Sequence, residues 1–265
     1  MLRSREGGRS TVHDFDLTGR VAIVTGGNRG IGRAIALALA QHGADVAIAS
    51  RDEEKTATVV EELTALGRRA LGVRCDVTRR DEIDAAVARI IQELGPPAIV
   101  VSNAGVGRAA RPEDITDEDW AAVIDTNLRA PLLLAQAARP SMLELGYGKV
   151  INIGSAASLF GTAQLTAYSA SKGGLLQLTR SIADAWARDN IQVNCILPGW
   201  VRTDLTAVGR EHERFIRRVT DRTPAGRWGE PEDVSGAAVF LASHASDFVT
   251  GVGIPVDGGY SAKLI

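Results

Sequence analysis

Short runs of apolar residues alternate along the chain with longer segments in which apolar residues recur every three or four positions. The first run, at residues 21–24, is apolar at every position, which is typical of a parallel strand buried on both faces of a sheet. Each later run except the last is likewise followed by a segment with the period of an amphipathic helix. The predicted strands cover residues 20–25, 45–49, 69–75, 98–101, 149–153, 191–197 and 252–256.

The segments between the strands predict helices with recognisable ends. In the first of these segments, Ile31, Ile35, Ala38 and Leu39 lie on one side of the helix, and Gly43 ends it. A long helix is capped by Thr116 or Asp117, and Pro131 falls inside it and should bend it. The helices after the first are expected over residues 52–66, 79–94, 117–145, 166–188, 203–223 and 230–243.

This alternation predicts an α/β fold in which parallel strands are joined by crossover helices. The chain has 265 residues and contains no linker, internal repeat or low-complexity tract, so we expect one domain over residues 15–265. Residues 1–14 begin with a charged, glycine-bearing stretch that has no apolar core. We interpret them as a flexible tail rather than a secretion signal.

Composition narrows the possible partners. The formal net charge is −2, so nothing indicates nucleic acid or a charged membrane. No run reaches the roughly 18 apolar residues that span a bilayer. Cys75 and Cys195 fall in predicted strands, which suggests reduced core residues of a cytoplasmic protein. The histidines share no ligand spacing, so no metal site is expected.

Three glycines stand where the first strand meets the first helix. Gly26, Gly30 and Gly32 would permit a tight turn, the close approach of a pyrophosphate and close packing of the helix. The start of the helix offers free N–H groups and the positive end of its dipole. The spacing is G-x-x-x-G-x-G rather than the familiar G-x-G-x-x-G. Because the trio follows the first strand of an alternating chain, it predicts a dinucleotide site.

The residues that end the second and third strands indicate which nucleotide binds. An acidic residue after the second strand would hold the 2′-hydroxyl of NAD, whereas arginine suits a 2′-phosphate. Here the strand ends in Ser50 and Arg51, and Arg29 lies in the glycine loop. This favours NADP(H), with NAD(H) as the alternative if both arginines are merely solvated. Asp76 is expected either to bind the adenine amino group or to cap the next helix.

Tyr168 and Lys172 lie four residues apart, on one face of a predicted helix. An ammonium group close to a phenol favours the phenolate, so we expect the pKa of Tyr168 to fall below its usual value near 10. Ser155 could offer a hydroxyl to the same reacting oxygen. The alternative is a surface ring covered by a lysine stem. The neighbouring motifs favour an acid/base pair instead.

These motifs together resemble the short-chain dehydrogenase/reductase family, over about residues 17–260. The shared marks are Thr25-Gly-x-x-x-Gly-x-Gly32, Asn103-Ala-Gly105, Asn127, Ser155, Tyr168-x-x-x-Lys172, Pro198-Gly199 and Thr203. Ser102 differs, since many relatives carry a second asparagine there. The resemblance implies a Rossmann-like, doubly wound parallel sheet of seven strands with helices on both faces. It also implies a homotetramer or homodimer.

The resemblance further implies a role for each motif residue. Tyr168 would exchange a proton with the substrate oxygen, Lys172 would lower its pKa and bind the nicotinamide ribose, and Ser155 would polarise the carbonyl. Asn127 would lie at a helix break and hold a proton-relaying water, and Thr203 would bind the nicotinamide carboxamide. The expected cofactor-binding residues are Gly26, Asn28, Arg29, Gly30, Ile31, Gly32, Ser50, Arg51, Asp76, Val77, Asn103, Ala104, Gly105, Tyr168, Lys172, Pro198, Gly199, Val201 and Thr203.

The substrate pocket is expected between the residues after Ser155, residues 106–109 and a mobile lid over about residues 204–222. The sequence is similar to members acting on sugar acids such as gluconate. We therefore expect NADP(H)-dependent interconversion of a secondary alcohol and a ketone, in a sugar acid or polyol. The alternatives are a 3-oxoacyl-thioester reductase, which needs a basic patch for an acidic carrier protein, and a non-catalytic nucleotide-binding regulator. Arginines and a histidine that could meet a carboxylate, or could be solvated, are Arg108, Arg202, Arg210 and His212.

The predicted helix that carries Tyr168 is apolar nearly all round, with Leu175, Leu178, Ile182 and Trp186 at different angles. A helix of this kind needs cover on more than one side. We therefore expect part of it to be covered by another subunit.

Overall fold

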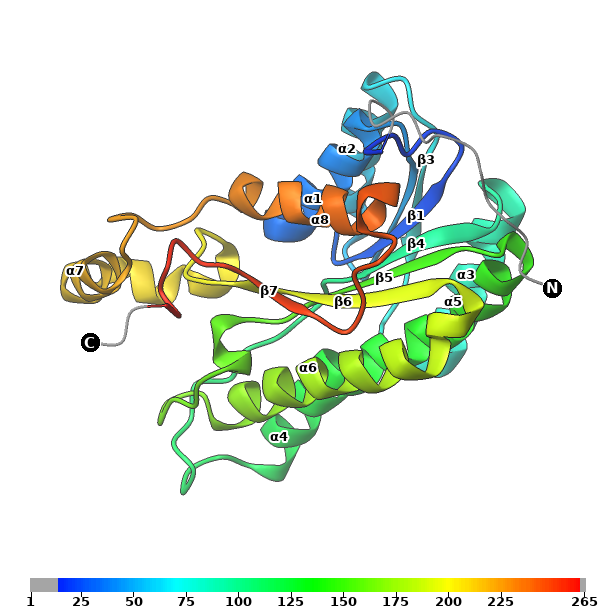
Figure 1. Cartoon of the computed structure of the whole chain (residues 1–265). Coiled ribbons are helices and arrows are strands. Elements are labelled where there is room, and N and C mark those ends of the chain that lie inside the picture. Colours follow the sequence, from blue (N-terminus) through cyan, green and yellow to red (C-terminus); the bar gives the residue numbers. More distant parts are fainter. Residues whose placement is uncertain (1–13, 263–265) are drawn as a thin grey trace.

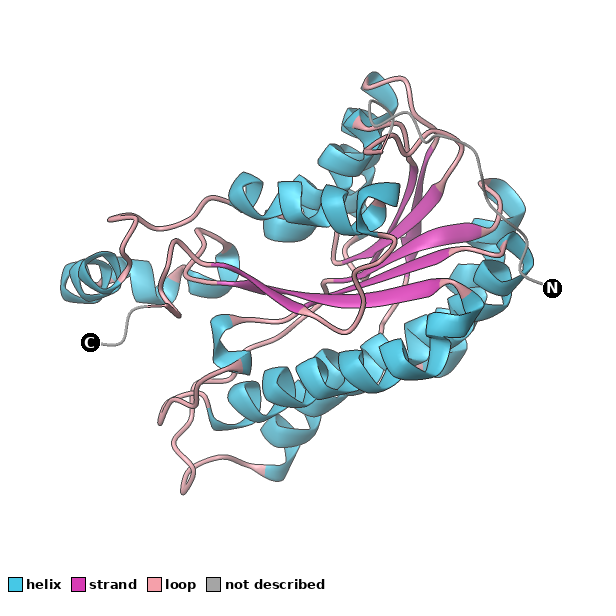
Figure 2. Cartoon of the chain, in the orientation of Figure 1, coloured by secondary structure: helices cyan, strands magenta, loops and turns pink. Residues whose placement is uncertain are grey.

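The computed structural model describes residues 14–262, which contain one sheet of seven parallel strands (Figures 1 and 2). The strand order is β3-β2-β1-β4-β5-β6-β7, so the chain winds from β1 to one edge and then from β4 to the other. This confirms the doubly wound Rossmann-like sheet. The strands are β1 Val21–Thr25, β2 Asp45–Ser50, β3 Ala70–Arg74, β4 Pro97–Ser102, β5 Gly148–Ile153, β6 Ile191–Pro198 and β7 Gly253–Val256.

Helices cover both faces of the sheet (Figure 1). One face carries α1 (Gly30–Gln41), α2 (Glu53–Ala65) and α8 (Pro231–Ala242), and α1 packs on α8. The other carries α3 (Arg80–Glu93), α4 (Asp117–Ile124), α5 (Ala130–Leu145) and α6 (Thr166–Trp186). In the described part of the chain, no helix combines the length and the apolar character that a membrane crossing requires.

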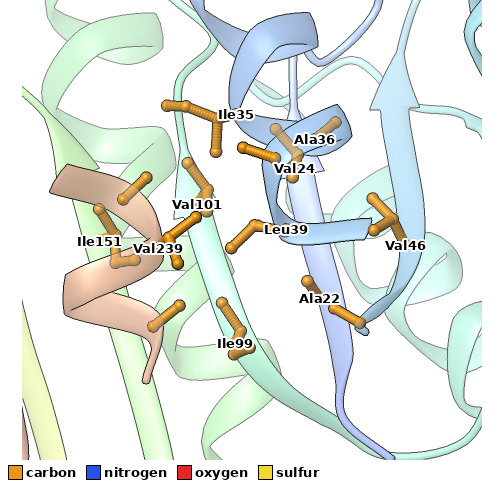
Figure 3. Packing of buried hydrophobic residues seen from close by; sticks show 14 of the residues in the cluster. Ala22, Val24, Ile35, Ala36, Leu39, Val46, Ile99, Val101, Ile151 and Val239 are labelled. Carbon is orange, nitrogen blue, oxygen red and sulfur yellow. The ribbon is translucent and has the colours of Figure 1, made fainter. Parts of the chain in front are cut away.

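Each central strand contributes alternate side chains to two apolar clusters. In β1, Ala22 and Val24 belong to the cluster under α1 and α8, together with Val239 (Figure 3). Val21 and Ile23 belong to the cluster on the opposite face, with residues of α3 and α5. Successive side chains of a strand point to opposite faces. The first apolar run has no polar position because both of its faces are buried.

The helix predicted over residues 117–145 is interrupted at Asn127. A π-helical turn, Asp125–Arg129, separates α4 from α5. Pro131 has no N–H and cannot bond the carbonyl of Asn127, four residues before it. The expected bend therefore takes the form of a local break of a kind common at functional sites. Thr116 caps α4, since its hydroxyl accepts from the N–H of Asp119 at 3.1 Å.

The segment predicted as one helix over residues 203–223 is instead two 3₁₀ turns followed by a short helix. The turns are Asp204–Thr206 and Val208–Glu211, and α7 spans Glu213–Arg222. The Thr206 hydroxyl lies 2.8 Å from the Val201 carbonyl and 3.1 Å from that of Thr203. These side-chain hydrogen bonds to backbone carbonyls compete with the backbone hydrogen bonds of a continuous α-helix. α7 projects beyond the sheet, on the side where the strands end (Figure 1).

Much of the apolar surface of α6 is buried within the chain itself, and cover of the rest by another subunit stays a prediction. Its apolar residues Leu175 and Ile182 are buried within the chain, and Leu178 and Trp186 pack against the same core. The exposed positions of α6 are polar or small residues, among them Gln177, Arg180, Ser181 and Asp184. A helix packed between a sheet and a second helix buries a wider arc than the sequence alone indicates.

Both cysteines are free and buried, as predicted. Cys195 lies in β6, whereas Cys75 directly follows β3. Burial raises the pKa of each thiol to about 11. The predicted flexible tail lies outside the described residues, apart from Asp14, whose carbonyl accepts from the N–H of Ala245.

Candidate active site

The carboxyl ends of β1, β4, β5 and β6 point to the same side of the sheet, and the motif residues follow them directly. β1 leads into the glycine loop, β4 into Asn103 and β5 towards Ser155, while β6 ends at Pro198. β1 and β4 are neighbours although the chain visits β2 and β3 between them. The crevice outside them is therefore a topological switch point, where ligands of open parallel sheets bind.

The glycine loop is shaped by positions that admit no side chain. Gly26 and Gly30 have φ angles of +60° and +51°, in the left-handed region. A Cβ on Gly32 would lie 2.4 Å from both the Gly26 carbonyl oxygen and Asn103 Nδ2. The same Nδ2 donates to the carbonyls of Thr25 and Gly26 at 3.0 Å. The side chain of Asn103 therefore supports the loop from behind.

The start of α1 is open to an anion. Arg29 is its N-cap residue and makes no capping hydrogen bond, and the first turn contains no acidic residue. The first N–H groups and the positive end of the dipole are thus available. Asn28 is buried beside them and Ile31 is half-buried. This cradle of backbone and small residues fits the diphosphate of a dinucleotide.

Arg29 and Arg51, the expected partners of a 2′-phosphate, are both exposed and both face a carboxylate. Arg29 Nη1 lies 3.0 Å from Asp204 Oδ2, and Arg51 Nη1 lies 3.9 Å from Asp76 Oδ2. Exposed ion pairs contribute little free energy, about 0–1 kcal/mol. Either guanidinium group can therefore exchange its carboxylate for a phosphate.

Asp76 shapes the turn before α3 but does not cap it. Its Oδ1 accepts from the N–H and the hydroxyl of Thr78, at 3.0 and 2.8 Å, while the N-cap residue is Arg79. The capping alternative is therefore wrong. Burial raises the pKa of Asp76, but the Thr78 hydrogen bonds and nearby arginines outweigh it, and the pKa is lowered. Val77 is half-buried against the core, and the buried Ser50 hydroxyl accepts from the N–H two residues on.

Tyr168 and Lys172 lie on α6 and meet Ser155, which follows β5. A side-chain hydrogen bond joins Tyr168 to Ser155. Lys172 is buried, and its Nζ donates to the Ile153 carbonyl at 2.7 Å. The same nitrogen lies 5.7 Å from the centroid of the Tyr168 ring. The alternative of an exposed ring under a solvated lysine stem therefore does not hold.

The expected fall in the pKa of Tyr168 is not seen in this structure. Burial raises the pKa of its phenol, and the Ser155 hydrogen bond opposes this only in part. Burial lowers the pKa of Lys172 to about 8. The four-residue spacing predicted the shared helix face correctly. It did not reveal that the ammonium group turns to the Ile153 carbonyl, nor that Lys172 is buried.

Asn127 joins the loop after β4 to α6. Its Nδ2 donates to the Val106 carbonyl and its Oδ1 accepts from the Val106 N–H, both at 2.9 Å. Nδ2 also lies 3.1 Å from the Ser171 hydroxyl, which donates to the Tyr168 carbonyl at 2.8 Å. The helix break at Asn127 is as expected, and the water relay stays a prediction. Sequence reasoning missed Ser171, although it lies three residues after Tyr168 on the same helix face.

The segment after β6 reaches the glycine loop at Thr203, and its expected contact with the nicotinamide stays a prediction. A Cβ on Gly30 would lie 3.3 Å from Thr203 Cγ2, and one on Gly199 would lie 2.7 Å from Asp257 Cβ. Val201 forms a bridge with Gly229. Ala104 is packed as closely on the other side of the glycine loop, since a Cβ on Gly26 would lie 3.1 Å from Ala104 Cα. Gly105 lies beside Asn127 and Lys172, because a Cβ there would lie 3.3 Å from Asn127 Oδ1 and 3.8 Å from Lys172 Nζ.

Leu205 and Gly107 bring the segment predicted as a lid close to Tyr168. A Cβ on Gly107 would lie 3.4 Å from Leu205 Cδ1 and 4.0 Å from Tyr168 Cδ2. The sequence predicted Leu205 as a lid residue but gave no signal for its contact with Gly107. A separate cleft, lined among others by Arg20, Tyr147 and His244, lies at the amino ends of β1 and β4 and contains none of the motif residues.

Comparison with known proteins identifies relatives over nearly the whole chain. A family model described as enoyl-(acyl carrier protein) reductase matches residues 26–261. A 2-dehydro-3-deoxy-D-gluconate 5-dehydrogenase of Escherichia coli is 42% identical over 94% of this chain and 98% of its own. A 5-keto-D-gluconate 5-reductase of the same organism is 42% identical over 92% of this chain and 96% of its own.

A solved gluconate 5-dehydrogenase from Burkholderia cenocepacia, in complex with NADP and tartrate, matches with a TM-score of 0.92. It is 38% identical and the match covers 96% of this chain and all of that one. The order of the motifs, the crevice in which the fold gathers them and these full-length matches agree with one another. The chain therefore belongs to the short-chain dehydrogenase/reductase family.

Proposed function

We propose that the protein is an NADP(H)-dependent oxidoreductase that interconverts a secondary alcohol and a ketone in a sugar acid of the gluconate class. The placement of Ser155, Tyr168 and Lys172 beside the glycine loop carries this proposal. The names of the relatives, which are sugar-acid dehydrogenases and reductases, supply the substrate class. A reduced or oxidised nicotinamide ring, when bound, supplies or accepts the hydride.

The chain's own groups manage the proton and the geometry. Tyr168 gives its phenolic proton to the ketone oxygen, or takes the alcohol proton in the reverse direction. Ser155, already bonded to that phenol, holds the substrate oxygen from the other side. Lys172, positively charged below its pKa of about 8, stabilises the phenolate that remains after the proton has left. Asn127 positions the loop and the helix around them.

Two features support NADP(H) over NAD(H). Arg29 lies in the turn after β1, Arg51 lies in the turn after β2, and no acidic residue directly ends β2. The Burkholderia relative was solved with NADP. A 2′-phosphate would displace Asp204 and Asp76 from the two guanidinium groups.

The test is a panel of sugar acids, polyols, cyclic ketones and acetoacetyl thioesters, followed at 340 nm with each cofactor. We expect the highest kcat/KM with a sugar acid, and at least a roughly tenfold preference for the 2′-phosphorylated cofactor, equal to about 1.4 kcal/mol. Highest activity with the thioester would support a 3-oxoacyl-thioester reductase instead. A preference below tenfold would show that the arginines do not select the cofactor.

We also propose that the protein is a homotetramer or homodimer of the cytoplasm. β7 is the edge strand of the sheet and pairs only with β6 among the described strands. The Phe248 side chain close to it is fully exposed, and Val252 is also exposed. Such an edge is usually covered. Light scattering should report two or four chains, and a smaller particle for Phe248→Asp. A wild-type monomer at micromolar concentration would contradict the proposal.

A further inference from the structure

Arg210 differs from the neighbouring arginines of residues 202–218. Arg202, Arg214, Arg217 and Arg218 are exposed, whereas Arg210 is half-buried. Arg202 pairs with Glu230 and Arg217 pairs with Glu213. Within residues 14–262, Arg210 has no carboxylate within salt-bridge distance. Its positive charge is therefore partly withdrawn from water without a protein counter-ion.

The hydrogen bonding of Arg210 is also incomplete. Its Nη2 donates to the Thr203 carbonyl at 3.0 Å, which fixes the guanidinium group in place. Its Nε is buried and has no hydrogen-bond partner among the described residues. A buried donor without an acceptor is unfavourable, and more so on a charged group. The planar edge of a guanidinium group is suited to bind both oxygens of a carboxylate or phosphate.

The hydrogen bond to Thr203 places Arg210 beside the active site. Thr203, its hydrogen-bond partner, lies against Gly30 of the glycine loop. Leu205, two residues further on, lies against Gly107 beside Tyr168. The start of the lid therefore separates the dinucleotide cradle from the substrate side. The one carboxylate on this turn, Asp204, is already paired with Arg29.

We propose that Arg210 binds an anionic group in the active site, and that this group is the carboxylate of the substrate. The assignment of the carboxylate rests on the proposed function. The diphosphate of a bound dinucleotide has the same chemistry and would lie by the glycine loop on the other side of Thr203, so the experiment must separate the two. In both cases the bound anion would fix the first two turns of the lid over the crevice.

The experiment compares Arg210→Gln with Arg214→Gln, which removes an exposed arginine from the same segment. KM and kcat are measured for gluconate and for sorbitol, a neutral polyol of the same length. The Kd of NADPH is measured separately by its fluorescence, without turnover. Circular dichroism melting shows whether each variant is folded, and Arg210→Lys, which keeps the charge but loses the planar edge, should recover part of any loss.

If the carboxylate is the ligand, Arg210→Gln should raise KM for gluconate about tenfold or more and leave sorbitol and NADPH within about twofold. A tenfold weaker Kd for NADPH would assign the same anion-binding role to the diphosphate. The proposal is overturned if gluconate and NADPH both stay within twofold, or if Arg214→Gln has the same effect. If the wild type oxidises no sugar acid, the proposed function fails, and the NADPH titration alone decides the role of Arg210.

Discussion

Replacing Tyr168 by phenylalanine should lower kcat by a factor of about 10²–10⁴ and leave the Kd of NADPH nearly unchanged. The substitution removes only the hydroxyl that bonds to Ser155, while the ring keeps its packing beside Gly107. Because burial raises the pKa of Tyr168, the neutral phenol is the form present at neutral pH, ready to donate its proton to a ketone. Steady-state kinetics in both directions and a fluorescence titration with NADPH measure the two effects.

Tyr147→Phe is the matched control. It also removes a phenolic hydroxyl, which bonds to Arg20 and to the Ala242 carbonyl at the opposite end of the sheet. It should lower the melting temperature without lowering kcat, because these partners lie away from the crevice. Should Tyr168→Phe keep full activity on the best substrate while Tyr147→Phe behaves as expected, the assignment of Tyr168 as the proton carrier is wrong.

Replacing Gly32 by alanine should weaken NADPH binding by about tenfold or more and destabilise the fold by about 1–3 kcal/mol. The added methyl group would lie 2.4 Å from the Gly26 carbonyl oxygen and from Asn103 Nδ2. The backbone oxygen cannot move without moving the loop that is expected to hold the diphosphate. The hydrogen bonds from Asn103 to Thr25 and Gly26 would be disturbed at the same time.

Gly236→Ala provides the contrast. Gly236 is exposed in the middle of α8, and a Cβ there would meet no atom within 4 Å. Alanine forms helices better than glycine, so this variant should be more stable by up to about 1 kcal/mol and should bind NADPH normally. Urea unfolding gives the stability change of each variant. Equal NADPH affinity in Gly32→Ala and the wild type would show that the glycine loop does not hold the diphosphate.

The elements that the sequence predicted well are those whose signal is local. The strands are apolar at successive positions because both faces are buried, and the bend expected at Pro131 follows from its missing N–H. The helix over residues 203–223 was predicted wrongly, because the Thr206 hydroxyl bonds the backbone of Val201 and Thr203 and favours a turn. The helical period of a charge-rich segment did not reveal this competition.

The order of strands and helices along the chain, the glycine loop at the end of β1 and the motif residues could all be identified from the amino-acid sequence, because each depends on backbone preferences and on neighbours a few positions apart. The folded chain was needed to show where Lys172 directs its ammonium group, that Asn103 holds a loop far away in the chain, and that Arg210 is half-buried without a carboxylate. These properties depend on burial and on partners brought together by the sheet. A side chain's charge state and its contacts are set by those partners rather than by its position in a motif.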